Sequence, residues 1–204
     1  MNIIAQELGK KFQNDWIFRR FNFTFEQTKS YAITGPNGSG KSTLLKIITG
    51  MMPATEGKIT YTNGDPLQEE SYYNHLVIAA PYLELIEEFT LDEFLRFHFK
   101  FKPLLPGKTI EDLLDFSYLK DSKNKRIKNF SSGMKQRLKL TLCFYSDVPV
   151  ALLDEPTTNL DKKGIAWYHE HANTLLKNRL TLLCSNRESE YSECDFRLDM
   201  EDFK

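Results

Sequence analysis

The loop from Gly35 to Thr43 constrains the fold of this chain more than any other part of the sequence. It follows a short apolar run at residues 31–34 and leads into a run with helical spacing at residues 44–48. A loop of the form Gly-x-x-x-x-Gly-Lys-Ser between a strand and a helix is typical of a phosphate-binding P-loop. A glycine-rich turn without a ligand is the alternative, and it would not need this pattern in this context. The sequence therefore predicts a nucleoside triphosphate site.

The residue types of the loop match that chemistry one by one. Glycines let the backbone curl so that its N–H groups point at an anion, and the following helix adds the positive end of its dipole. Lys41 supplies a positive charge for the β- and γ-phosphates, and the Ser42 hydroxyl is a hard-oxygen ligand for Mg²⁺. The predicted phosphate-binding residues are Gly35, Pro36, Asn37, Gly38, Ser39, Gly40, Lys41, Ser42 and Thr43.

Two acidic residues follow a second buried segment. Residues 148–153 form an uninterrupted apolar run, which is typical of a strand inside a parallel sheet, and Asp154 and Glu155 come directly after it. Ligands bind at the carboxyl ends of such strands. Asp154 can hold Mg²⁺, directly or through water, and Glu155 can orient or deprotonate an attacking water. Two acidic side chains beside a phosphate chain would repel it unless Mg²⁺ and Lys41 offset the negative charge. We therefore expect Asp154 and Glu155 to lie near the P-loop.

A third segment, residues 129–137, contains Ser131, Ser132 and Gly133 and precedes a leucine-rich run. Serines and a glycine at a helix N-terminus can bind an anion. A plain N-cap is the alternative, and it would be preferred if this segment stood alone.

The remaining pattern predicts an α/β chain. Phe21, Phe23 and Phe25 alternate with polar residues, as in a half-buried strand. Residues 57–62 and 75–80 are expected to be strands, and residues 109–116 a helix. Thr90 and Glu93 form a capping box that predicts another helix. The charged connector at residues 120–128 lacks interleaved aromatic residues, so we expect a solvated loop rather than a nucleic-acid site.

Composition excludes several classes of protein. The sequence has 204 residues and a formal net charge of −1, which argues against electrostatic capture of nucleic acid. No apolar run approaches the roughly 20 residues that span a bilayer, and the N-terminus lacks the features of a secretion signal. Cys143, Cys184 and Cys194 have no metal-ligand spacing, and we expect them to be reduced thiols in a cytoplasmic protein.

Together these motifs resemble the ATP-binding-cassette (ABC) ATPases over nearly the whole chain. Gly35 to Thr43 resembles the Walker A loop of that family, and residues 150–155 its Walker B strand. Residues 130–134 resemble its signature loop, with matches at Ser131 and Gly133 and departures at Phe130, Ser132 and Met134, and residues 158–161 resemble its D-loop. Phe12 lies where the family places an aromatic residue that stacks on adenine, with Trp16 as the alternative.

The resemblance implies one P-loop NTPase domain over residues 1–204. Its mostly parallel core sheet would carry an N-terminal antiparallel β subdomain and a helical subdomain inserted at about residues 85–145. Two departures bear on turnover. Pro81 lies at about the position of the family's glutamine that contacts Mg²⁺. Residues 181–185 are expected to be the last core strand, and Asn186 directly after them stands where the family has a histidine that contacts the γ-phosphate. An amide donates a neutral hydrogen bond but takes no positive charge, so hydrolysis of ATP is expected to be slow.

The resemblance also implies partners. The signature loop of one cassette would face the P-loop of another, so the working unit would pair this chain with a second copy or a paralogue over two ATP molecules. A separate membrane-spanning permease would dock near residues 81–88, which would hold this cassette on the cytoplasmic face of the membrane. Tyr82, Leu83, Leu85 and Ile86 could form that contact surface or belong to the core. The alternatives are a soluble ABC ATPase acting on ribosomes or nucleic acid, and another P-loop class such as a kinase or GTPase.

Overall fold

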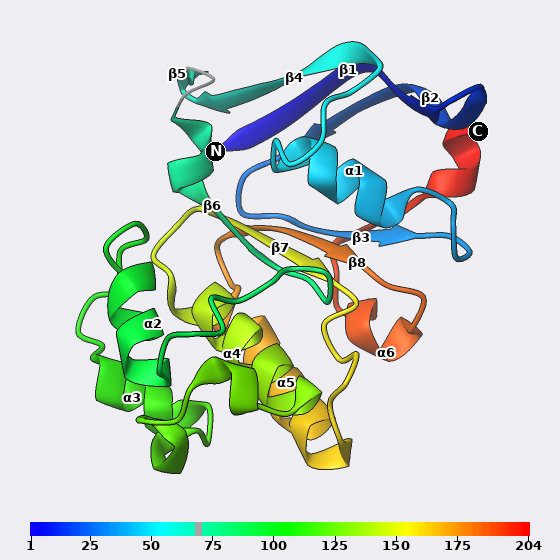
Figure 1. Ribbon diagram of the computed structural model, residues 1–204. Helices are drawn as coiled ribbons and strands as arrows, with labels where there is room; N and C mark the ends of the chain where they lie inside the picture. The colour runs from blue at the N-terminus through cyan, green and yellow to red at the C-terminus, as the bar shows by residue number, and fades with distance from the viewer. Residues whose placement is uncertain (68–70) are drawn as a thin grey trace.

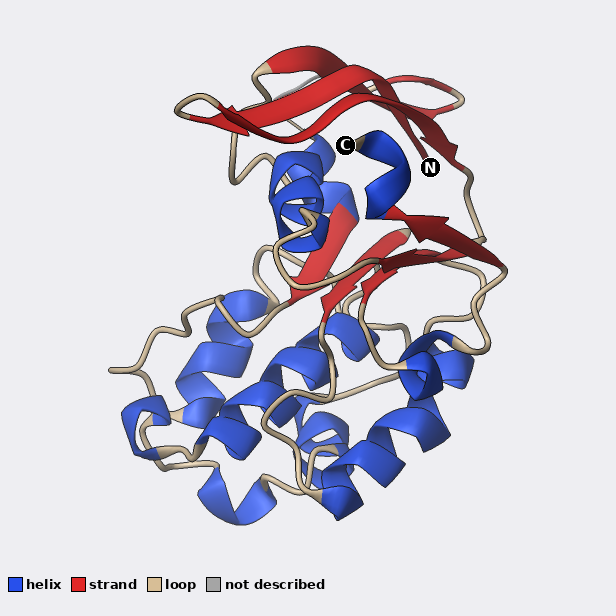
Figure 2. Cartoon of the chain, turned by 90° about the vertical axis from the view of Figure 1, so that its right-hand side faces the viewer, coloured by secondary structure: helices blue, strands red, loops and turns tan. Residues whose placement is uncertain are grey.

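The computed structural model describes residues 1–67 and 71–204. Figures 1 and 2 show its layers: an antiparallel sheet at the top, a parallel sheet across the middle, helix α1 between the two sheets, and most other helices below. This arrangement confirms the expected P-loop NTPase architecture, in which a parallel core sheet carries an N-terminal antiparallel sheet.

The antiparallel sheet has the strand order β2-β1-β4-β5. Its strands are β1 (Asn2–Phe12), β2 (Asp15–Phe25), β4 (Glu56–Asn63) and β5 (Asp65–Pro66). The alternating phenylalanines lie on β2 as expected: Phe21 and Phe25 are fully buried, and Phe23 is partly buried. The 3₁₀-helix η4 (Met200–Phe203) packs under this sheet, where the ring centroids of Phe203 and Phe21 are 4.6 Å apart.

The parallel sheet has the strand order β6-β7-β8-β3-β9. Its strands are β3 (Ser30–Thr34), β6 (Leu76–Ala79), β7 (Val150–Asp154), β8 (Leu180–Cys184) and β9 (Phe196–Asp199). Strand β7 is buried along its whole length, and its side chains alternate between two cores. Val150 and Leu152 pack with α1 and the antiparallel sheet, whereas Ala151 and Leu153 pack with the lower helices. Because both faces are covered, the strand is a continuous apolar run.

The helices lie on the two faces of this sheet. They are α1 (Lys41–Ile48), α2 (Leu91–His98), α3 (Ile110–Phe116), α4 (Ser132–Tyr145), α5 (Lys162–Leu175) and α6 (Glu188–Tyr191). Thr90 and Glu93 form the expected capping box at the start of α2, and Thr109 and Asp112 form a second one at α3. Among the described residues, no helix combines the length and the apolar character needed to cross a bilayer. Cys143, Cys184 and Cys194 are free thiols.

The structure differs from the sequence-based expectations at three places. The strand expected at residues 75–80 spans only Leu76–Ala79, because His75 ends the 3₁₀-helix η1 (Tyr72–His75). Strand β8 is not the last strand of the core, since β9 follows it and pairs with β3. The connector at residues 120–128 is not wholly solvated: it contains the 3₁₀-helix η2 (Lys120–Ser122), and Ile127, which begins η3 (Ile127–Asn129), is fully buried.

Gly57 allows β4 to approach a bulge in β1. Its φ is +76°, and a Cβ built on it would lie 2.3 Å from the carbonyl oxygens of both Gln6 and Glu7. We expect Gly57→Ala to lower the free energy of unfolding by at least about 2 kcal/mol, because it adds a backbone clash to the strain of a positive φ. For a chain of this length, thermal unfolding should shift down by at least about 4 °C.

Gly64→Ala is the matched control. Gly64 also has a positive φ, of +85°, but a Cβ there would meet no atom of the described residues within 4 Å. Gly64→Ala should therefore lower the free energy of unfolding only by the strain of its positive φ. Equal losses of stability in the two variants would contradict the account of Gly57 as a site of close approach.

Candidate nucleotide-binding site

The site is formed where three parallel strands end side by side. Strand β8 lies between β7 and β3, and its Cys184 is in register with Asp154 of β7 and Ile33 of β3. The P-loop follows β3, the acidic pair lies at the end of β7, and Asn186 follows β8. The sheet thus brings together residues that are more than a hundred positions apart in the sequence.

The P-loop is shaped by backbone conformations that favour glycine. Gly35, Gly38 and Gly40 have φ values of +132°, +84° and +107°. A Cβ at Gly40 would lie 2.7 Å from Cγ2 of Ile17, so the loop is also packed against the antiparallel sheet. Gly40 is the N-cap of α1 and has no side chain that could cap the helix, and the first turn contains no acidic residue. The N–H groups of that turn therefore remain free to bind an anion.

The Lys41 side chain is held by hydrogen bonds to the P-loop itself. Its Nζ donates hydrogen bonds to the carbonyl oxygens of Gly35, at 2.7 Å, and Pro36, at 3.1 Å. The residue is only 5% exposed. This places a buried positive charge next to the free N–H groups, as the predicted phosphate site requires.

Asp154 carries the features of a cation ligand. It is 2% exposed, and neither carboxylate oxygen has a hydrogen-bond partner among the described residues. Burial raises the pKa of its carboxyl, whereas the adjacent Ser42 hydroxyl lowers it. Buried carboxylates without partners are costly unless a cation or a donor satisfies them. The hard oxygen atoms of Asp154 and Ser42 therefore fit Mg²⁺.

Glu155 stands beside this carboxylate in a constrained backbone conformation. Its φ is +43°, and its N–H donates to the carbonyl oxygen of Cys184 at 2.8 Å. Its side chain accepts a hydrogen bond from the Thr158 hydroxyl at 3.2 Å. The half-buried side chain thus lies at the edge of the site, a suitable place for a group that acts on a water molecule.

Asn186 reaches the P-loop from the other side. Its Nδ2 donates a hydrogen bond to Oδ1 of Asn37 at 2.8 Å. Both side chains are exposed. The bond joins the segment after β8 to the tip of the P-loop.

The predicted signature loop lies on α4, on the opposite face of the parallel sheet from α1 (Figure 1). The Ser131 side chain accepts a hydrogen bond from the N–H of Met134 and so acts as the N-cap of α4. Ser131 and Ser132 are exposed. A Cβ at Gly133 would lie 3.0 Å from the carbonyl oxygen of Asn159, so the loop lies next to the predicted D-loop.

The two candidate adenine-stacking residues lie in the hairpin of β1 and β2. Phe12 is 45% exposed and lies 5.1 Å from the Lys10 ammonium. Trp16 packs against Arg19, whose guanidinium carbon lies 4.4 Å from the ring. Ile17, which contacts Gly40, brings this hairpin next to the P-loop.

Sequence reasoning missed three residues that border the site. Gln136 of α4 is buried and donates to the carbonyl oxygen of Pro156, just after the acidic pair. Lys139 of the same helix donates to the carbonyl oxygens of the segment after β6. Tyr82 of that segment lies beside Asp154, while Pro81 is exposed. No local pattern marks these residues, because each contact joins distant parts of the chain.

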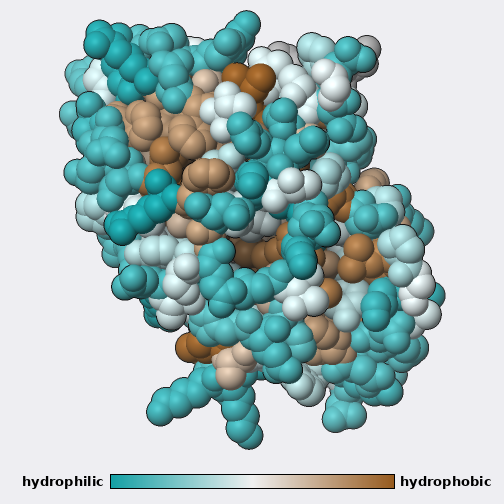
Figure 3. Space-filling model, turned by 180° about the vertical axis from the view of Figure 1, so that it is seen from behind, coloured by the Kyte–Doolittle hydropathy of each residue, from teal (hydrophilic) through white to brown (hydrophobic). Residues whose placement is uncertain are grey.

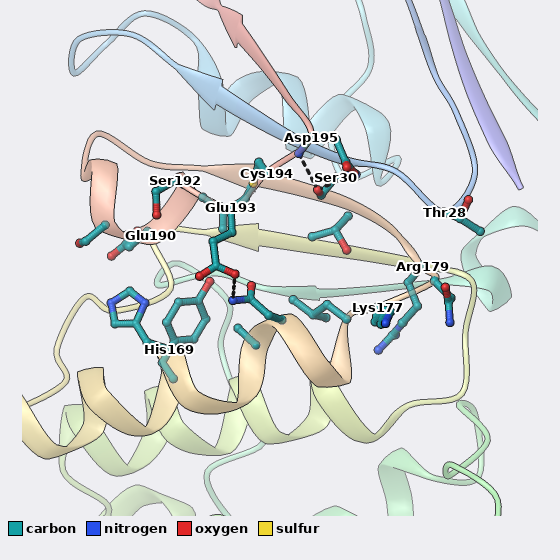
Figure 4. Close-up of a pocket in the computed structure, with 18 residues that line it drawn as sticks. Thr28, Ser30, His169, Lys177, Arg179, Glu190, Ser192, Glu193, Cys194 and Asp195 are labelled. Atoms are coloured by element: carbon teal, nitrogen blue, oxygen red, sulfur yellow. Dashed lines mark hydrogen bonds between the residues drawn. The ribbon is translucent and has the colours of Figure 1, made fainter.

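A pocket of about 410 Å³ lies away from the P-loop, between α5, α6 and the starts of β8 and β3 (Figure 4). Acidic groups on its wall pair with polar neighbours: Asp195 accepts a hydrogen bond from the Ser30 hydroxyl at 2.8 Å, and Glu193 accepts one from Asn173. Lys177 and Arg179 also line it. The pocket contains none of the predicted nucleotide-binding residues.

The similarity of the chain to known proteins agrees with this geometry. A family model described as "ABC transporter" matches residues 18–158. The uncharacterized ABC transporter ATP-binding protein YybJ of Bacillus subtilis is 29% identical over 95% of this chain and 89% of its own length. The Nod factor export ATP-binding protein I of Rhizobium johnstonii is 31% identical over 92% of this chain, which spans 62% of that relative.

Solved structures give the same result. The ATP-binding subunit of an ABC transporter superposes with a TM-score of 0.82, at 26% identity, and the match covers 98% of this chain and 87% of that structure. A putative ABC transporter ATP-binding protein from Pyrococcus furiosus gives a TM-score of 0.81 at 21% identity, with full coverage of both chains. Together with the site geometry, these matches show that this chain belongs to the ABC transporter family, as an ATP-binding ATPase subunit.

Proposed function

We propose that this chain binds ATP with Mg²⁺ at the P-loop and hydrolyses it to power transport through a separate membrane-spanning subunit. The observation that carries this proposal is the convergence of Lys41, Ser42 and the unpaired Asp154 carboxylate, with Glu155 adjacent. This set combines a phosphate-binding charge, cation ligands and a base within one strand-end site.

Each residue then has a defined role in hydrolysis. The free N–H groups of the P-loop and Lys41 bind the β- and γ-phosphates and stabilise the charge that develops on them. Ser42 and Asp154 would hold Mg²⁺, which would neutralise part of the phosphate charge. Glu155 orients the attacking water and accepts its proton. Asn186 donates a neutral hydrogen bond near the γ-phosphate, so the step is expected to be slower than with a charged donor at this position.

A second cassette would complete the site. Ser131 and Ser132 are exposed at the N-terminus of α4, on the far face of the sheet from α1. That exposure supports an arrangement in which they bind the ATP held by the P-loop of another cassette, so that two cassettes enclose two nucleotides. ATP would favour the closed pair, and hydrolysis would release it.

Aspartate at position 131 should prevent this closure. Ser131→Asp keeps a good N-cap but places a negative charge against the γ-phosphate, whereas Ser131→Asn keeps the cap without the charge. With Glu155→Gln in the background to slow hydrolysis, we expect ATP and Mg²⁺ to double the mass measured by light scattering. Ser131→Asp should weaken the dimer at least about tenfold relative to Ser131→Asn. Equal dimerisation of the two variants, or no ATP-dependent mass change at all, would contradict the pairing of two copies.

A groove suited to a protein partner lies beside α2. It has a volume of about 330 Å³, and most of its lining is apolar. Leu83 and Leu85 line it, with Met51 and Tyr73 exposed at its wall. Of the loop residues expected at a contact surface, Leu85 packs on the core and Ile86 is exposed. Exposed apolar surface also lies in a hollow across the middle of the face shown in Figure 3.

The groove beside α2 supports docking of the membrane-spanning subunit there, because contiguous exposed apolar patches mark interaction sites. The chain would then work in the cytoplasm, peripherally attached to the inner face of the membrane.

A further inference from the structure

The segment that follows β6 directs one polar side chain into the site. Tyr82 is partly buried as a residue, but its hydroxyl oxygen is fully buried. Its ring packs against α1, where Nζ of Lys46 lies 4.1 Å from the ring centroid. The aromatic ring is therefore held by the helix that follows the P-loop, in a cation–π contact.

The same segment is held from the opposite side by α4. Nζ of Lys139 donates to the carbonyl oxygens of Ala80 and Pro81, each at 3.0 Å. Lys139 is only 8% exposed, so these two bonds are shielded from water. Tyr82 is the next residue along the chain, and its position is thus fixed by two helices from the two faces of the sheet.

The Tyr82 hydroxyl and the Asp154 carboxylate are both buried polar groups with unused hydrogen-bonding capacity. Ala79 of β6 is in register with Leu153 of β7, so the segment after β6 leaves the sheet next to Asp154. Burial and the nearby Asp154 carboxyl raise the pKa of the Tyr82 hydroxyl. Yet neither the hydroxyl nor either carboxylate oxygen makes a hydrogen bond of normal geometry among the described residues. A buried hydroxyl without a partner destabilises the fold, because it has given up its hydrogen bonds to water. A binding site explains why such a destabilising arrangement is present, because the Tyr82 hydroxyl and the Asp154 carboxylate would gain partners when a ligand binds.

We propose that Tyr82 is a positioning residue of the cation site, whose hydroxyl donates a hydrogen bond to the Asp154 carboxylate when Ser42 and Asp154 hold the divalent cation. This inference rests on the proposed function and adds a residue to it. The bond orients the carboxylate toward the cation, as outer partners of metal ligands do. Through Lys139, it also links occupancy of the cation site to α4, which carries Ser131.

Binding of Mn²⁺, measured by electron paramagnetic resonance, tests the proposal. The full chain carries Glu155→Gln to prevent turnover and is saturated with ATP before Mn²⁺ is titrated. We expect Tyr82→Phe to weaken Mn²⁺ binding by about tenfold, the lower end of the range for loss of an outer-sphere partner. ATP affinity measured without metal should not change, because the hydroxyl acts through the cation site. The temperature of thermal unfolding of the metal-free protein should change little, since the removed hydroxyl makes no hydrogen bond of normal geometry with the described residues.

Tyr118→Phe is the matched control, because it removes the same hydroxyl from a residue that is 74% exposed. Mn²⁺ affinity in Tyr82→Phe equal to that of the control would overturn the proposal. An equal loss of metal-free ATP binding would also overturn it, because the effect would then be one on the whole loop. Failure of the proposed function would look different: the parent protein itself would bind no Mn²⁺ with ATP, or Asp154→Asn would bind it equally well.

Discussion

Replacing Lys41 with alanine should weaken ATP binding at least about 100-fold. Lys41 is the buried positive charge of the P-loop, and it is held by the carbonyl oxygens of Gly35 and Pro36. Hydrogen bonds to charged groups contribute about 1.5–3 kcal/mol each. Loss of such bonds to two phosphate groups therefore corresponds to a factor of about 100 or more in affinity. Isothermal titration with ATP measures this directly.

Lys58→Ala is the matched control, because it removes an exposed lysine from β4, outside the site. It should bind ATP as the parent protein does. Thermal unfolding of both variants separates loss of binding from loss of folding, since Lys41 also donates hydrogen bonds within the P-loop itself. Unchanged ATP affinity in a folded Lys41→Ala variant would contradict the location of the phosphate site.

Glu155→Gln should lower the rate of ATP hydrolysis by roughly 10²–10⁴-fold, the contribution of a positioned general base. The amide has nearly the same shape but cannot accept the proton of the attacking water. Because Asp154 and Lys41 remain in place, ATP affinity should change little. Phosphate release measured with excess ATP and Mg²⁺ gives the rate, and titration of the same sample gives the affinity.

Glu188→Gln makes the same chemical change at an exposed position on α6 and should leave the rate unchanged. The assignment of Glu155 as the base would be wrong if its glutamine variant hydrolysed ATP as fast as the Glu188→Gln variant. A variant that lost binding and hydrolysis together would also contradict it, because Glu155 would then act on ground-state binding.

The sequence predicted those parts of the fold that local chemistry determines. The glycines of the P-loop are required by positive φ values, and the apolar run of β7 is required by burial on both faces. The capping box of Thr90 and Glu93 needs only neighbouring residues, so it could be identified without knowledge of the tertiary structure. The positions of the strand ends then follow from the general geometry of parallel sheets.

Other features depend on contacts that no local pattern records. Ile127 stands in a charged segment, yet it is buried because the segment runs back along the start of α2. Asn186 could be aligned with a strand end, but its bond to Asn37 depends on strand order. Tyr82 was expected to be part of an apolar contact surface or of the core, and that expectation gave no sign of the buried hydroxyl that lies near Asp154. In each case the tertiary structure, not the residue type, decides the role.

Affinity capture of this chain from its native membranes in mild detergent tests the central claim most directly. The account predicts a stoichiometric polypeptide with several membrane spans, together with a second cassette, either another copy of this chain or a paralogue. Capture of ribosomal proteins or nucleic acid without a membrane-spanning partner would contradict the account and favour a soluble ATPase of the same family.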